Sequence, residues 1–157
     1  MEFYAAAEGT IKPADMTLFR NVIRIVEHLP DIVFDPKERE WGLCKNQVTC
    51  HLICRALAAY FPAECVDGYF TKGYQHSWLV PRSRSSIIDV YPVAGASPFI
   101  VSMDWRSPWK KFYRPADVYL SNRLDGTDFV KRLEITAYTV AETMGTLGIR
   151  HQKSKAA

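Results

Sequence analysis

The sequence predicts an α+β fold, in which a few helices pack on a small antiparallel sheet. Two observations support this class. Apolar residues recur at helical spacing in three separate segments, two before the middle of the chain and one near its end. Between the second and third of these, short stretches rich in β-branched and aromatic residues follow one another closely, as in a β-meander. With 157 residues, 48% of them hydrophobic, residues 1–150 suit one domain with one core.

The first helix is expected from Ala14 to His28. Its apolar residues recur every three or four positions, and Pro13 stands just before it, where proline suits a helix start. Leu29 and Pro30 end it. Residues 31–41 contain a proline and a run of charges, so they are expected to form a loop.

A second helix is expected to start near Lys45 or Asn46 and to run to about Tyr60, because Pro62 stops it. Its buried side is expected to carry Cys50, Ile53, Cys54, Leu57 and Phe61. Both cysteines of this side are therefore interpreted as core residues.

Three strands are expected after this helix, at residues 63–70, 75–80 and 86–91. The polar residues 81–85 join the last two strands in a turn. A turn of this kind makes the two strands antiparallel.

The remaining segments are a loop region and a packing helix. Residues 92–124 mix prolines with aromatic residues and are expected to form long loops, with one extra strand at 99–103. A long helix is expected at about 128–147, with Thr127 as its cap. The basic tail, residues 151–157, is expected to be disordered.

Composition excludes several classes of protein. No apolar run approaches the roughly 20 residues that a membrane span needs, and Met1–Tyr4 lack the features of a secretory leader. We therefore expect no membrane contact and a cytoplasmic location, and the sequence is also compatible with delivery into another cell. The net charge is +3, and the basic residues are scattered apart from Lys110-Lys111, flanked by Arg106 and Arg114, and a short tail with Lys153 and Lys155. Nucleic-acid binding is therefore disfavoured, because phosphate recognition usually shows a denser basic stripe. The oligomeric state is left open.

The four cysteines are expected to be reduced, because three of them fall in one helical region and no secretory segment accompanies them. Of the four, Cys44 is the candidate nucleophile. It follows Gly42-Leu43 where the loop is expected to become helix, and the unpaired amides and dipole of a helix start favour a thiolate. The Cys44 amide would then be an oxyanion donor. Taken alone, a cysteine in such a place is more often structural.

The partners of this cysteine change that estimate. His76 and Asp89 lie on the two adjacent antiparallel strands, so they are expected to be direct or diagonal neighbours, within reach of a hydrogen bond. A carboxylate so placed orients an imidazole and stabilises its charged form. The joint arrangement predicts a nucleophile, a base and an orienting acid.

These residues carry a resemblance to a known superfamily. The motif Gly42-Leu-Cys44 at a helix start is followed by Gly68-Tyr69, then His76-Ser-Trp78, and then Asp89 in a strand that closes near Pro92. In this order the motifs resemble the core of the transglutaminase-like superfamily of papain-like cysteine enzymes. The resemblance covers about residues 41–92. Val48 departs from it, because a small residue is usual there.

The resemblance implies a papain-like core, with the nucleophile at a helix N-terminus packed on a small antiparallel sheet. It also implies thiol acyl-transfer chemistry with Cys44, His76 and Asp89 as the triad. We expect a cysteine hydrolase that acts on peptide or side-chain amide bonds of a protein or peptide substrate, as a peptidase or glutamine deamidase, through a thioester. The alternative is an acyl transferase of transglutaminase type. Neither needs a metal or an organic cofactor.

Further residues are candidates for the oxyanion hole or the substrate groove. Trp41 and Asn46 are candidates for the second oxyanion donor, and Trp78 and Tyr91 for the groove wall. Trp78 is equally well explained as core beneath His76.

Competing interpretations remain. His51 is rejected as the base for Cys50, because adjacent helical residues do not face each other. A zinc site of Cys50, His51, Cys54 and Cys65 would not match a common zinc-finger spacing. A non-catalytic adaptor could keep the fold and bind partners through the aromatic loop at 105–113, although these aromatics could simply cover the sheet.

Overall fold

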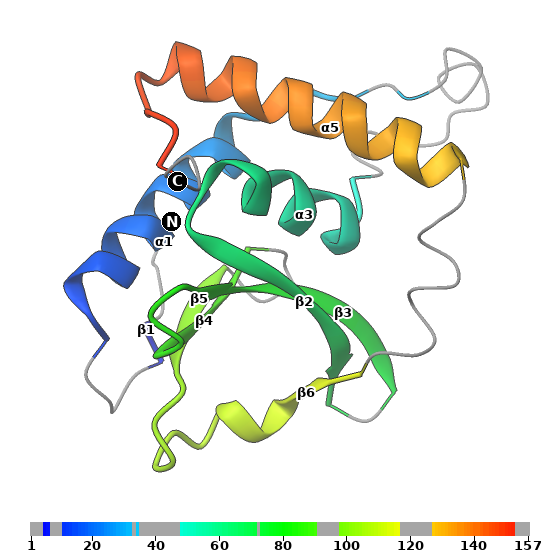
Figure 1. The fold of residues 1–157 in the computed structure, drawn as a ribbon. Helices are drawn as coiled ribbons and strands as arrows, with labels where there is room; N and C mark the ends of the chain where they lie inside the picture. The colour runs from blue at the N-terminus through cyan, green and yellow to red at the C-terminus, as the bar shows by residue number, and fades with distance from the viewer. Residues whose placement is uncertain are drawn as a thin grey trace, which may run out of the picture.

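The protein has a mixed α+β architecture. In the computed structural model the described residues are 5–6, 11–32, 34, 48–71, 73–90, 98–116 and 127–152. Their strands form one sheet in the order β1-β5-β4-β3-β2-β6, and the three α-helices described lie together on one side of it (Figure 1). The α+β class predicted from the sequence is confirmed.

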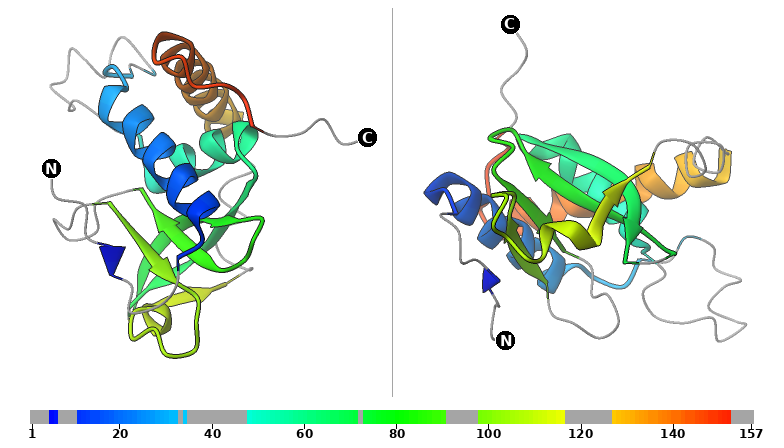
Figure 2. Two further views of the ribbon diagram at one scale, coloured as in Figure 1. Left: turned by 90° about the vertical axis from the view of Figure 1, so that its left-hand side faces the viewer. Right: turned by 90° about the horizontal axis from the view of Figure 1, so that it is seen from below.

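The helices form two layers above the sheet. Helix α3 (Cys50–Tyr60) lies directly on strands β2 and β3, and α5 (Thr127–Thr146) packs on the outer side of α3. Helix α1 (Pro13–His28) lies beside them, against the end of the sheet that holds β1 and β5 (Figure 2). Helices α1 and α5 match their predicted segments to within one residue at each end.

The start of α3 differs from the prediction. Thr49 is the residue before the helix, with extended backbone angles (φ −72°, ψ 159°), and Val48 is not helical either. The amides of Leu52 and Ile53 both donate to the Thr49 carbonyl, as expected for a residue at this position. A helix start near Lys45 or Asn46 was therefore wrong, and Cys50 occupies the first helical position.

The strands follow the predicted meander. They are β1 (Ala5–Ala6), β2 (Ala63–Phe70), β3 (Tyr74–Pro81), β4 (Ser86–Asp89), β5 (Phe99–Ser102) and β6 (Tyr113–Pro115), the last preceded by the short 3₁₀ helix η1 (Lys110–Phe112). All neighbouring pairs are antiparallel except β1 and β5. Strands β1 and β6 were not predicted, because two- and three-residue strands carry almost no periodicity.

Gly68 allows β6 to join the sheet. It lies opposite His76 on β3 and Pro115 on β6. A Cβ atom at this position would lie 2.8 Å from the Trp78 ring and still closer to the Arg114 carbonyl oxygen. A larger residue would therefore push β6 away from β2.

Two apolar clusters occupy the two faces of the sheet. The cluster under the helices includes Val22, Leu57, Leu79, Ile88 and Val140. The cluster on the opposite face contains Trp78, Val80, Ile87, Val101 and Tyr113. Because side chains alternate along a strand, Leu79 packs in the cluster under the helices while Trp78 packs in the second cluster.

A buried carboxylate fixes the turn between β3 and β4 to the first turn of α1. Asp15 is only 3% exposed, and its Oδ2 accepts hydroxyl hydrogen bonds from Ser83, Ser85 and Ser86 at 2.7 to 2.8 Å. These bonds satisfy the carboxylate inside the protein. The turn that sets the register of the two strands is thereby held in place.

The C-terminal segment differs in part from the prediction. The amide of Gln152 donates to the Tyr60 carbonyl at 3.0 Å, and the His151 ring lies edge-on to Tyr60. These two residues are therefore placed against α3 and are not part of a disordered tail. Residues 153–157 lie outside the described residues. Among the helices that are described, none combines the length and the apolar character required to cross a membrane.

Candidate active site

His76 and Asp89 are in contact at the centre of the candidate site. The β3–β4 pairing sets Leu79 opposite Ile88, so Asp89 lies diagonal to His76. His76 Nε2 lies 2.8 Å from Asp89 Oδ2, and the two residues are 1% and 0% exposed. The contact expected from the strand pattern is present.

Tyr113 is a third member of this cluster that sequence reasoning missed. Its hydroxyl donates to the same Asp89 Oδ2 at 2.8 Å. Burial and the neighbouring carboxylate raise the pKa of Tyr113 well above its usual value, so the phenol stays a hydrogen-bond donor. Two donors on one oxygen fix the carboxylate, and β6 brings the second donor.

Cys50 also interacts with His76. The two side chains are hydrogen-bond partners, and Nε2 of the ring is already engaged with Asp89. Cys50 is the first residue of α3, and this first turn contains no acidic side chain. The thiol therefore lies at the start of a helix and beside an imidazole.

The electrostatics of His76 fit this arrangement. Burial disfavours the charged ring, but the hydrogen bonds with Asp89 and Cys50 outweigh burial and raise the pKa of His76 from 6.5 to about 9. The imidazole is therefore mainly protonated at neutral pH. A protonated imidazole next to a thiol is the arrangement that activates cysteine nucleophiles.

The other described cysteines lie in environments that keep them neutral. Burial raises the pKa of Cys54 well above its ordinary value, and its thiol donates to the Ser77 carbonyl at 3.3 Å. Burial also raises the pKa of Cys65, to about 12. Both thiols are free, as is Cys50, and Cys50 is the described cysteine that faces an imidazole.

A polar network anchors the first turn of α3 to the sheet. Asp67 on β2 binds the Arg55 guanidinium with both carboxylate oxygens and also accepts the Ser77 hydroxyl. Ser77 in turn accepts from His51 Nδ1. Burial opposes ionisation of Asp67, but its hydrogen bonds with His51, Arg55 and Ser77 outweigh burial and lower its pKa well below the usual range.

This network gives His51 a structural position. Its Nδ1 atom contacts the Ser77 hydroxyl and lies 3.6 Å from Asp67 Oδ1. Ser77 is next to His76 on β3, and His51 is next to Cys50 on α3. The bond between His51 and Ser77 therefore helps to position Cys50 relative to His76.

Several predicted site residues lie outside the described residues. They are Cys44, Trp41, Asn46 and Tyr91. Their predicted roles stay predictions. Trp78 is described and is only 1% exposed, within the second cluster and in ring contact with His76. This burial favours the core alternative for Trp78.

One sequence signal could have singled out Cys50. Threonine is a favourable residue just before a helix, and Thr49 precedes Cys50 directly. The prediction instead placed the start of this helix near Lys45 or Asn46, which put Cys44 where the loop becomes helix.

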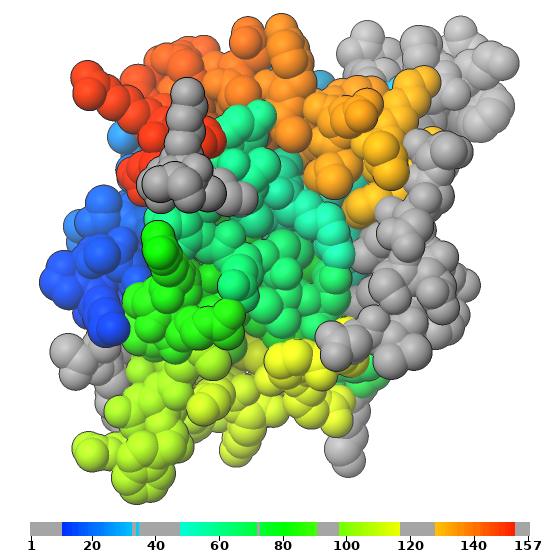
Figure 3. Space-filling view, viewed as in Figure 1, coloured from blue at the N-terminus to red at the C-terminus, as the bar shows by residue number. Residues whose placement is uncertain are grey.

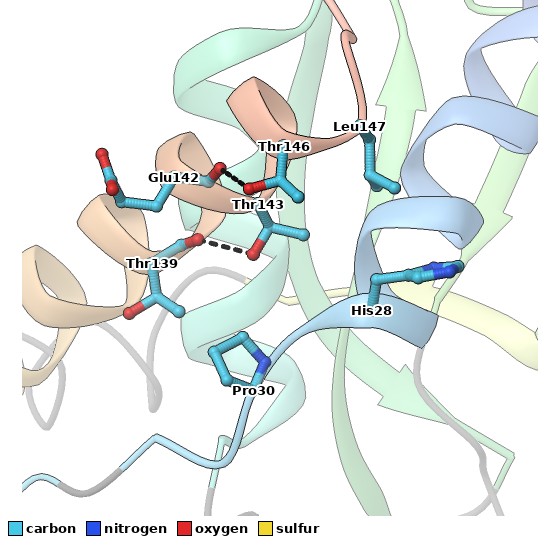
Figure 4. A pocket seen from close by; sticks show the side chains of 7 residues that line it. All are labelled: His28, Pro30, Thr139, Glu142, Thr143, Thr146 and Leu147. Carbon is cyan, nitrogen blue, oxygen red and sulfur yellow. Dashed lines mark hydrogen bonds between the residues drawn. The ribbon is translucent and has the colours of Figure 1, made fainter.

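A pocket at the other side of the molecule has different chemistry. It has a volume of about 280 Å³ and lies between the end of α1 and α5 (Figure 4). The hydroxyls of Thr143 and Thr146 in its lining donate to carbonyls of their own helix, so they offer little to a ligand. No group of three or more His, Cys, Asp and Glu side chains suited to a metal ion occurs in the described parts of the chain.

Comparison with known proteins returned no match. No protein-family model, no curated protein and no solved structure resembles this chain significantly. The site is therefore interpreted from its own geometry.

Proposed function

We propose that this protein is a thiol-dependent amide hydrolase in which Cys50 is the nucleophile, His76 the base and Asp89 the orienting acid. One observation carries the proposal. His76 binds Asp89 through Nε2 and has Cys50 as a second hydrogen-bond partner, and Cys50 begins a helix. In this proposal the fold is a papain-like, transglutaminase-like core, in which a nucleophile at a helix start faces a histidine on the sheet.

The proposed reaction has two halves, in which a thioester on Cys50 is first formed and then hydrolysed. The Cys50 thiolate attacks the carbonyl carbon of a peptide or side-chain amide, and the oxygen takes the negative charge. In this proposal the backbone amide of Cys50, at the start of α3, donates to that oxyanion. His76 then gives its proton to the amine that leaves, and a thioester remains on Cys50.

Water completes the reaction. His76, now neutral, accepts a proton from the attacking water, and the thioester breaks into a carboxylic acid and the Cys50 thiol. Asp89 keeps the ring in the orientation that both proton transfers need. Transfer of the acyl group to an amine would use the same thioester and stays a prediction from the sequence. No cofactor takes part in these steps, and a cytoplasmic location would keep the thiol reduced.

The test is site-resolved alkylation of the native protein. Limiting iodoacetamide is applied between about pH 5 and 9, and the modified cysteine is identified by mass spectrometry. We expect Cys50 to react first, already near pH 6, and to lose this advantage in the His76→Ala variant. Cys54 and Cys65 are internal controls, because their raised pKa values predict slow reaction.

Two matched variants separate the candidate nucleophiles. Cys50→Ala should remove the fast reaction and leave the circular dichroism spectrum unchanged, whereas Cys44→Ala should keep the fast reaction. If Cys44 instead reacts first and depends on His76, the role of nucleophile passes to Cys44. Slow reaction of all four cysteines would contradict an enzyme and favour the adaptor.

A further inference from the structure

The segment between β5 and β6 exposes large aromatic side chains. Trp105 is 83% exposed and Trp109 is 44% exposed, whereas Phe112 and Tyr113, which follow in the chain, pack against the second apolar cluster. The two tryptophans therefore do not cover the sheet. Large apolar side chains that stay in water at neighbouring positions are typical of interaction surfaces.

The same segment carries the net positive charge of the chain. Residues 104–114 hold four basic residues (Arg106, Lys110, Lys111 and Arg114) and one acidic residue, Asp104, for a net charge of +3. The whole chain also has a net charge of +3, so the remainder is balanced. Positive charge is thus concentrated on the segment that exposes the tryptophans.

Three of these basic residues, Arg106, Lys110 and Lys111, are exposed and available to a partner, whereas Arg114 donates to the Thr71 carbonyl. The Asp104 side chain accepts the Arg106 amide at 2.9 Å, so its carboxylate is engaged in holding the turn. Arg106 lies over the Trp105 ring and Lys111 over the Phe112 ring, at 5.3 and 5.4 Å from the ring centres. A cation over a ring is oriented but keeps its outward hydrogen-bonding capacity.

The surface is joined rigidly to the candidate active site. The amide of Thr71, in the turn between β2 and β3, donates to the Phe112 carbonyl at 2.9 Å, and Tyr113 binds Asp89. Figure 3 shows this segment, coloured yellow-green, along the lower edge of the molecule, outside the cover of the helices. A chain held there would therefore lie on the strand that supports the triad.

We propose that residues 104–114, the basic aromatic surface, bind an acidic segment of the protein substrate. This inference rests on the proposed function and names its substrate class. Carboxylates complement the free cations, and exposed tryptophan beside arginine is the composition that dominates protein-binding surfaces. The concentration of charge in one short loop matches a short peptide better than a nucleic-acid backbone, which needs a longer positive track.

The test is direct binding to the Cys50→Ala protein, so that no turnover is required. A short fluorescein-labelled peptide rich in glutamate is titrated by fluorescence anisotropy at low salt. A lysine-rich peptide of equal length, a single-stranded oligonucleotide and anionic lipid vesicles are titrated in parallel. We expect the acidic peptide to bind most tightly and its affinity to fall as salt rises.

Matched variants locate the binding surface. Arg106→Ser, Lys110→Ser and Lys111→Ser together should weaken binding at least about tenfold, and Trp105→Ser alone should also weaken it. The control removes three exposed charges from the helices, at Arg20, Arg24 and Lys131, and should leave binding nearly unchanged.

Each contrary result overturns the proposal. An acidic peptide that does not bind, an equal loss in the control, or tighter binding of the oligonucleotide or vesicles would each exclude an acidic peptide as the ligand of this surface. The alkylation rate of Cys50 is measured separately, in proteins that retain Cys50. Loss of peptide binding with fast alkylation retained would reject this inference alone, and slow alkylation with binding retained would reject the catalytic function alone.

Discussion

Strand β4 connects two buried carboxylates that look alike but differ in their partners. Near its start, Ser86 donates to Asp15, which also accepts two other serine hydroxyls. At its end, Asp89 accepts His76 and Tyr113. Both carboxylates are satisfied and almost inaccessible, at 3% and 0% exposure.

The difference between them lies in what their partners can do. Serine hydroxyls do not titrate, so the Asp15 cluster can only hold the turn in place. His76 does titrate, and it shares a hydrogen bond with the Cys50 thiol, so a proton held by the Asp89 cluster can move. Burial and hydrogen bonding alone therefore do not distinguish a functional carboxylate from a structural one. A hydrogen-bond partner that titrates does distinguish them.

The largest expected effect comes from removing the charge of Asp89. In Asp89→Asn we expect the alkylation rate of Cys50 near neutral pH to fall about 100-fold, because the imidazolium loses the carboxylate that stabilises it. The rate is measured by mass spectrometry of the native protein. The effect should stay smaller than that of removing the thiol, and no effect at all would exclude Asp89 as the third member.

The pH dependence of stability should separate the two clusters. The pKa of His76 is raised from 6.5 to about 9. The contribution of the charged ring to the free energy of unfolding is therefore complete below about pH 6.5 and is lost as pH rises through about 9. We expect the free energy of unfolding to fall by on the order of 2 to 3 kcal/mol over this range. Urea unfolding at several pH values measures it.

The control for this pH effect is His76→Gln, which should flatten the fall because the titrating ring is gone. Asp15→Ala should keep the same slope at lower overall stability, since its serine partners do not titrate. If His76→Gln keeps the full slope, other groups cause the fall.

A smaller effect is expected from Asp15 itself. Asp15→Ala removes the acceptor of three buried hydroxyl bonds, and we expect a loss of about 1 to 2 kcal/mol in the free energy of unfolding, because the hydroxyls can turn to other partners. The alkylation rate of Cys50 should not change. A large fall in that rate without a loss of stability would contradict a purely structural role.

The smallest effect is expected from Tyr113. Tyr113→Phe removes one of the two donors to Asp89 and should lower the alkylation rate of Cys50 by less than about tenfold. A pH profile of the rate distinguishes positioning from packing, because a change in how Asp89 holds the imidazolium should move the profile. An unmoved profile would limit Tyr113 to packing.

Local patterns predicted much of the fold and half of the candidate site. The apolar periodicity of α1 and α5 and the alternation in β3 and β4 involve neighbouring residues, so the sequence carries them directly. The contact of His76 with Asp89 was predictable for the same reason. The two residues lie on strands joined by a short turn, and their distance follows from strand geometry.

What the sequence by itself determined is this local framework of helices, meander and His76–Asp89 pair. The tertiary structure decided the rest. The start of α3 depends on packing as much as on propensity, and this packing brings Cys50 to His76. Tyr113 reaches Asp89 because β6 pairs with a strand more than 40 residues earlier in the chain, at Phe70. This pairing depends on Gly68, which lets the backbone of β6 approach β2 closely. A three-residue strand has no periodicity from which the pairing could be predicted.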